Sequence, residues 1–167
     1  MFTSLFVLAV APAFSQFSGG IDLGLPSGTP FSTYSSVAFG LSARYEAPIS
    51  GVDKLNWTAT AGFLSFAGKS YTVSGGGVSV SGNYNSITVI PLMGGVKYYF
   101  QEANAGFYVA ADLGLYLVSG GGASDNRFGI APGLGYRMDK WDFTVRLNTP
   151  SDFNYLGLRG AYIFGGK

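Results

Sequence analysis

The sequence predicts an all-β fold, and two observations indicate it. Long segments alternate between apolar residues and small or polar ones with a period of two, the spacing at which successive residues of a strand point to opposite faces. Charged residues make up only 11% of the 167 residues, against about 25% in ordinary soluble domains. Each strand therefore has one apolar face, and its other face carries too little charge for an ordinary water-exposed surface.

The segments Ser36–Glu46 and Phe107–Val118 show this alternation most clearly. In the first, the apolar face carries Val37, Phe39, Leu41, Ala43 and Tyr45. The other face carries Gly40, Ser42, Arg44 and Glu46. An apolar face opposite a face of glycine and isolated charges is typical of a barrel with lipid outside and a small polar lumen inside.

Eight segments with this alternation are bounded by turn residues. They are Phe17–Leu25, Ser36–Glu46, Lys54–Phe63, Ser86–Phe100, Gly106–Val118, Arg127–Arg137, Trp141–Asn148 and Asn154–Phe164. Most are close to the ~9–11 residues that a tilted strand needs to cross a bilayer. The sequence therefore predicts an eight-stranded antiparallel up-and-down transmembrane β-barrel.

The first 15 residues are predicted to be a signal peptide. Phe2–Ala11 is apolar, and Ala13, Phe14 and Ser15 form a small-x-small cleavage site before Gln16. The barrel domain is accordingly predicted to comprise residues 16–167.

The predicted connections alternate in length along the chain. Four of them form one set: Pro26–Ser35, Ala67–Asn85, Ser119–Asn126 and Thr149–Phe153. The other set is mostly short: Ala47–Asp53, Gln101–Ala105 and Met138–Lys140. The longest, Ala67–Asn85, is rich in Gly, Ser and Asn and is predicted to be flexible. Long loops on one side and short turns on the other are typical of outer-membrane barrels and predict periplasmic N- and C-termini.

Outward-facing aromatic residues gather at the end of the strands where the termini lie. The predicted membrane-interface aromatics are Tyr45, Trp57, Phe100, Phe107, Tyr136, Trp141, Tyr162 and Phe164. Amphipathic rings favour the headgroup level of a bilayer, so these residues predict a belt at the periplasmic interface.

The period of two also assigns charged residues to the lumen face. They are Asp22, Arg44, Glu46, Lys97, Asp112, Arg137, Asp142, Arg146 and Arg159. Because an unpaired charge in a narrow lumen is costly, we expect these five cations and four anions to pair and to plug the barrel. The alternative is a narrow porin-like channel for small solutes, with charged selectivity.

Several function classes are disfavoured by composition. The chain has no cysteine and no histidine, which excludes a Cys/His zinc site, a cysteine nucleophile and a histidine general base. The net charge of +1 gives no electrostatic reason to expect binding to nucleic acid. We therefore predict neither an enzyme activity nor a cofactor.

Two segments carry a resemblance to a known family. Ile90–Phe100, with the sequence IPLMGGVKYYF, is similar to a central strand of small outer-membrane barrels, and Leu158-x-Gly160-x-Tyr162-x-Phe164 is similar to their closing strand. The chain resembles the OmpA/OmpX-like and opacity-porin-like barrels of Gram-negative bacteria, especially those of Bacteroidetes type. This resemblance implies a monomer in outer-membrane lipid, inserted by the barrel assembly machinery.

The expected role is therefore structural, or a surface interaction in which the loops Pro26–Ser35 and Ala67–Asn85 contact an extracellular ligand. A soluble lipocalin-like binding protein is the competing hypothesis. That protein would need the apolar face of each strand to point inward.

Overall fold

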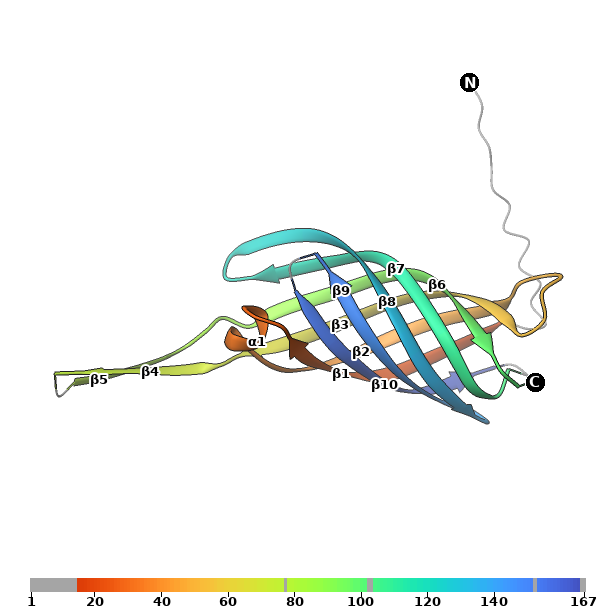
Figure 1. Ribbon diagram of the computed structural model, residues 1–167, viewed down its shortest axis with the longest axis horizontal. Coiled ribbons are helices and arrows are strands. Elements are labelled where there is room, and N and C mark those ends of the chain that lie inside the picture. The colour runs from red at the N-terminus through yellow and green to blue at the C-terminus, as the bar shows by residue number, and fades with distance from the viewer. Residues whose placement is uncertain (1–14, 77, 102–103, 152, 166–167) are drawn as a thin grey trace, which may run out of the picture.

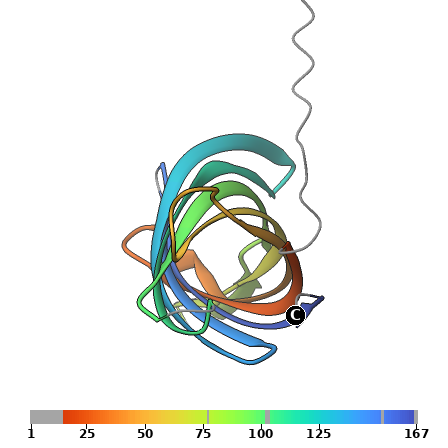
Figure 2. The same ribbon diagram turned by 90° about the vertical axis from the view of Figure 1, so that its right-hand side faces the viewer.

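The computed structural model describes residues 15–76, 78–101, 104–151 and 153–165. The predicted signal peptide lies outside the described residues, except for Ser15. Eight strands close into an antiparallel barrel in the order β1-β10-β9-β8-β7-β6-β3-β2 (Figures 1 and 2). They are β1 (Gln16–Ser27), β2 (Ser35–Pro48), β3 (Leu55–Gly68), β6 (Ile87–Tyr99), β7 (Gly106–Gly120), β8 (Ala123–Met138), β9 (Trp141–Pro150) and β10 (Asn154–Phe164). The predicted eight-stranded up-and-down barrel is confirmed.

Each barrel strand pairs with its neighbours in sequence, and β1 closes the barrel against β10. The closing register runs from the pair Phe17 and Phe164 to the pair Ser27 and Asn154. Strand β3 pairs directly with β6 because the two strands between them leave the barrel. No helix in the described part of the chain is long and apolar enough to cross a membrane.

The segment Ala67–Asn85 is not the flexible loop that its composition predicted. It contains β4 (Ser70–Gly75) and β5 (Val78–Asn83), which form a separate two-stranded sheet. The many Ser and Gly residues of this segment suggested a loop, but β-branched residues alternate with them, and Val73 pairs with Val80 across the two strands. In the loop Pro26–Ser35 the structure adds one helical turn, α1 (Phe31–Tyr34).

The predicted loop Ser119–Asn126 is also shorter than expected. Pairing between β7 and β8 continues as far as Gly120 and Ala123, and Gly121 and Gly122 make the turn between them. Both turn glycines have positive φ, at +60° and +85°. Glycine adopts this conformation without steric cost, so a two-residue turn can join strands that run well past the predicted boundary.

The apolar faces of the barrel strands point outward. On β7, Leu113 and Leu115 are 55% and 46% exposed, and the buried side chains of Asp112 and Tyr116 lie on the opposite face. The other strands follow the same rule, because alternate residues of a strand face opposite sides.

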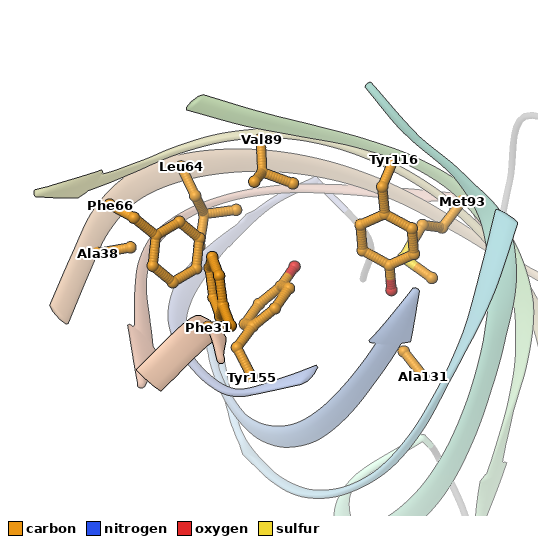
Figure 3. Close-up of a cluster of buried hydrophobic side chains, with 9 residues drawn as sticks. All are labelled: Phe31, Ala38, Leu64, Phe66, Val89, Met93, Tyr116, Ala131 and Tyr155. Atoms are coloured by element: carbon orange, nitrogen blue, oxygen red, sulfur yellow. The ribbon is translucent and has the colours of Figure 1, made fainter. Parts of the chain in front are cut away.

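The lumen is not polar along its whole length. Its loop end holds an apolar cluster of Phe31, Ala38, Leu64, Phe66, Val89, Met93, Tyr116, Ala131 and Tyr155 (Figure 3). Phe31 enters from α1, and its ring centroid lies 5.1 Å from that of Phe66 and 4.7 Å from that of Phe153. The prediction of a polar lumen was incomplete for two reasons. At this end the inward-facing strand residues, such as Phe66 and Val89, are themselves apolar, and the period of two does not identify a loop residue such as Phe31 that folds into the mouth.

Candidate functional site

The structure places the nine charged residues assigned to the lumen face inside the barrel. Seven strands contribute them, and none of the nine is more than 6% exposed. The eighth strand, β3, contributes the polar side chains of Asn56, Thr58 and Thr60 to the same interior. The charges divide into two groups along the barrel, which we name the lower and the upper cluster.

The lower cluster consists of Glu46, Lys97, Arg137 and Asp142, near the end of the barrel where β1 begins and β10 ends. Lys97 Nζ lies 3.1 Å from a Glu46 oxygen and 2.6 Å from an Asp142 oxygen. Arg137 Nη2 lies 2.6 Å from Glu46 and 3.1 Å from Asp142. Each cation therefore contacts both carboxylates, and the four formal charges sum to zero.

Tyrosine hydroxyls complete the lower cluster. Tyr99 donates to Glu46 at 2.8 Å, and Tyr108 donates to Asp142 at 2.6 Å. The Lys97 ammonium also lies 4.2 Å from the centre of the Tyr108 ring, within the range of a cation–π contact. Sequence reasoning did not identify either tyrosine as a hydrogen-bond partner of a carboxylate, because two strands far apart in the sequence must meet to form each contact.

The upper cluster consists of Asp22, Arg44, Asp112, Arg146 and Arg159. Arg44 and Arg146 each lie 3.4 Å from the same oxygen of Asp112. Arg146 also lies 3.5 Å from Asp22. Three arginines thus face two carboxylates, and the surplus positive charge of the lumen lies in this cluster.

Arg159 is the cation of the upper cluster that contacts no carboxylate in the described part of the chain. It lies directly opposite Asp22 in the closing register, but its Nε donates to Ser42 Oγ at 2.8 Å. Ser42 in turn donates to Asp22 at 2.5 Å. A second nitrogen of Arg159 donates to Ser18 Oγ at 3.1 Å. The Ser42 hydroxyl therefore lies between Arg159 and Asp22 and forms a hydrogen bond with each.

Not every guanidinium nitrogen in the lumen is satisfied. The buried nitrogens without a hydrogen-bond partner among the described residues are Nη1 of Arg44, Nε of Arg137, Nε of Arg146 and Nη1 of Arg159. Three of these four belong to the upper cluster, where donors outnumber carboxylate oxygens. The described residues contain no group of three His, Cys, Asp or Glu side chains that could hold a metal ion.

Glycines on the lumen face provide the space that the long side chains occupy. A Cβ on Gly133 would lie 2.7 Å from Cγ of Arg146, and a Cβ on Gly20 would lie 3.1 Å from Nε of Arg159. Both separations are shorter than ordinary van der Waals contact. Eight strands leave an interior just wide enough for side chains, so these positions need the smallest residue.

The eight predicted interface aromatics lie on the outside of the barrel, at the end that carries the lower cluster. Phe100, Phe107, Tyr136, Trp141 and Phe164 are exposed, and Tyr45, Trp57 and Tyr162 are partly exposed. Several of them contact one another across neighbouring strands. Ring centroids are 5.1 Å apart for Tyr45 and Trp57, 4.7 Å for Phe107 and Tyr136, and 5.4 Å for Trp141 and Tyr162.

The sequence matches no protein-family model and no curated protein. The structure of the neisserial surface protein A (NspA) matches with a TM-score of 0.55 at 13% identity, over 89% of this chain and 95% of NspA. The chain has an NspA-like barrel fold.

Two further structures match over a similar length. Ail, the attachment invasion locus protein of Yersinia pestis, has a TM-score of 0.49 at 13% identity, over 90% of this chain and 97% of Ail. A de novo designed transmembrane β-barrel has a TM-score of 0.49 at 12% identity, over 89% of this chain and 95% of the design.

Proposed function

We propose that this protein is an integral outer-membrane β-barrel with a structural or surface-interaction role. The observation that carries the proposal is the distribution of side chains across the barrel wall. Large apolar residues cover the outside of the strands, and the buried charges lie inside. A water-soluble barrel of this size has no reason to expose such a surface, whereas a bilayer favours it.

The side-chain directions count against the soluble lipocalin-like alternative. That alternative needs an apolar cavity and a polar outer surface. Phe39 and Leu41 on β2 are 67% and 66% exposed, and their neighbour Arg44 is buried. Transferring these exposed side chains from water to hydrocarbon is favourable by roughly 1.5–3 kcal/mol for each one that is fully buried.

The belt of aromatic residues supports an orientation in which the termini are periplasmic. The belt lies at the end of the barrel where β10 ends. The tight turn between β8 and β9 lies at the same end (Figure 1). The opposite end, which carries α1 and the β4–β5 hairpin, would then face outward from the cell. We further propose that the protein is an OmpA/OmpX-like barrel of a Gram-negative, Bacteroidetes-type bacterium, inserted by the barrel assembly machinery.

We propose that the lumen is a structural plug, and two features support this role. Ion pairs cross the lumen between strands that are not neighbours, such as the opposite strands β2 and β8 through Glu46 and Arg137. The apolar cluster around Phe31 and Phe66 fills the loop end above the charges. A narrow channel for small solutes is less well supported, because a solute would have to pass both the paired charges and the apolar cluster.

We also propose that the protein has no enzyme activity. The four lumen carboxylates are engaged by arginine, lysine or hydroxyl donors, so none is free to act as a general base.

Detergent partitioning and gel mobility test the proposed function. The protein should enter the detergent phase of a Triton X-114 extraction, and in SDS it should migrate faster before boiling than after, because a closed barrel resists SDS until it is heated. Recovery in the aqueous phase, with the same mobility before and after boiling, would show that the protein is not a membrane barrel. Planar-bilayer recording tests the plug separately, and steady single-channel conductance would favour the channel.

A further inference from the structure

The upper cluster carries one positive charge more than its carboxylates neutralise. Its three arginines, Arg44, Arg146 and Arg159, are 1%, 6% and 3% exposed. Its carboxylates, Asp22 and Asp112, are buried as well. Arginine stays protonated in proteins, so the cluster cannot lose its surplus charge by releasing a proton. A buried charge without a counter-charge is costly, and a counter-ion from solution would remove that cost.

The ion pairs of the upper cluster are also longer than those of the lower cluster. Guanidinium nitrogens of Arg44 and Arg146 lie 3.4 Å from Asp112, and Arg146 lies 3.5 Å from Asp22. The corresponding distances in the lower cluster are 2.6–3.1 Å, and charge-assisted hydrogen bonds of this kind are ordinarily about 2.7–2.9 Å long. The two carboxylates of the upper cluster therefore do not engage its arginines fully.

The three guanidinium groups lie close together. Arg44 and Arg146 contact the same oxygen of Asp112. Arg159 donates to Ser18, which lies directly opposite Arg44 in the register of β1 and β2, and the like charges of Arg44 and Arg146 both act on Arg159. Each arginine has one nitrogen without a hydrogen-bond partner among the described residues, namely Nη1 of Arg44, Nε of Arg146 and Nη1 of Arg159. The cluster thus presents three unpaired donors together with one surplus charge.

We propose that the upper cluster binds one small monovalent anion such as chloride. A guanidinium has N–H donors and no acceptor, so its ligand must accept hydrogen bonds. One negative charge balances the surplus of one, whereas a divalent anion such as sulfate would leave an excess of negative charge. The interior of an eight-stranded barrel is just wide enough for side chains, which favours a single-atom ion over a large organic acid.

Water is the competing occupant of such a site. A buried water can accept a hydrogen bond from an unpaired nitrogen, but it is neutral and leaves the surplus charge of the three arginines uncompensated. An anion satisfies the donors and balances the charge. A plugged lumen needs no bound ion, so the anion site goes beyond the proposed function.

Urea unfolding of the full-length protein in non-ionic micelles tests the site, with sodium chloride replaced stepwise by sodium gluconate. Constant ionic strength keeps the screening of charges equal, gluconate is too large for the cluster, and urea, unlike guanidinium chloride, supplies no chloride. Once chloride exceeds its dissociation constant, each tenfold increase should raise the folding equilibrium constant about tenfold, the limit for one ion per folded chain. A folding equilibrium that does not depend on chloride would overturn the proposal.

Two variants with the same change in charge separate the cluster from the protein surface. Arg159→Gln removes the surplus charge of the upper cluster and should abolish the dependence on chloride. The matched control Lys140→Gln removes one positive charge from an exposed position in the turn between β8 and β9 and should respond to chloride like the wild type. Equal dependence on chloride in both variants would show a general salt effect and would contradict a site in the lumen.

Bromide locates the ion in the wild type, so the test does not depend on the folding of Arg159→Gln. In crystals grown in sodium bromide, an anomalous difference peak should lie within hydrogen-bond distance of at least two of the three guanidinium groups. Peaks at the protein surface alone would mean an adventitious ion only, and an interior without a peak would leave the unpaired nitrogens to water. Either result would overturn the proposal.

Heat-modifiable mobility, measured on the same samples, separates this proposal from the proposed function. A wild type that shows the mobility shift but no response to chloride refutes the anion site and leaves the membrane barrel intact. A wild type without the shift refutes the membrane barrel, whatever its response to chloride.

Discussion

Lys97 and Asp142 lie 45 positions apart in the sequence, yet their charged atoms are 2.6 Å apart inside the barrel. They come from β6 and β9, which are not neighbours in the closed sheet. The ion pair therefore crosses the lumen instead of following the wall. Contacts of this kind connect strands that are not neighbours, so interactions inside the lumen contribute to the stability of the barrel.

Removing one carboxylate from the upper cluster should destabilise the barrel strongly. Asp112→Ala leaves both Arg44 and Arg146 without their shared counter-charge, and breaking a buried pair in this way costs about 3–5 kcal/mol. Arg146→Ala should have a similar effect, because Asp22 and Asp112 both lose a partner. Denaturant unfolding in micelles measures the change.

Asp125→Ala is the matched control for this carboxylate. Asp125 pairs with Arg127 at 2.9 Å, but its side chain is 61% exposed, and exposed pairs contribute about 0–1 kcal/mol. Equal loss of stability for Asp112→Ala and Asp125→Ala would show that water screens the lumen charges as it screens surface charges.

Of the three arginines in the upper cluster, Arg159 should contribute least to the free energy of unfolding. Arg159→Gln removes a positive charge that has no direct carboxylate partner, and glutamine can still donate to Ser42 or Ser18. We expect a smaller loss in the free energy of unfolding than for Arg146→Gln, whose arginine contacts two carboxylates. A larger loss for Arg159→Gln would mean that the relay through Ser42 is stronger than a direct ion pair.

The apolar cap at the loop end should contribute to stability through Phe31. Phe31→Ala removes a buried ring that packs against Phe66 and Phe153, and such truncations cost about 3–5 kcal/mol when the cavity cannot collapse. Unfolding in micelles measures the loss. Thr33→Ala, at an exposed position of the same helical turn, is the control and should have little effect.

The outward face of β7 provides a directional test of the membrane assignment. Leu115→Arg should cost about 2–4 kcal/mol and impair insertion, because an arginine near the bilayer midplane loses its hydration. A cysteine at Leu113 or Leu115 should react with a lipid-soluble thiol reagent and resist an impermeant one. Strong labelling of either position by the impermeant reagent in intact outer membranes would contradict a lipid-facing strand.

Sequence alone was enough to predict the number of barrel strands and the direction of their side chains. The reason is local, since the period of two in segments such as Ser36–Glu46 follows from the pleat of a single strand. Any register that kept the apolar faces outward would place Arg44 and Asp112 inside. Composition likewise indicated that the charges were too few for a water-exposed surface.

Only the tertiary structure determined which charges meet and at what depth. A strand's periodicity gives the side on which a residue lies, but its height in the barrel depends on the tilt and stagger of all eight strands. For this reason the pairing of Lys97 with Asp142, and the separation of Arg159 from Asp22 by Ser42, could not be predicted. Phe31 enters the lumen from a loop without periodicity, and Val73 meets Val80 only because a glycine-rich segment folds back on itself.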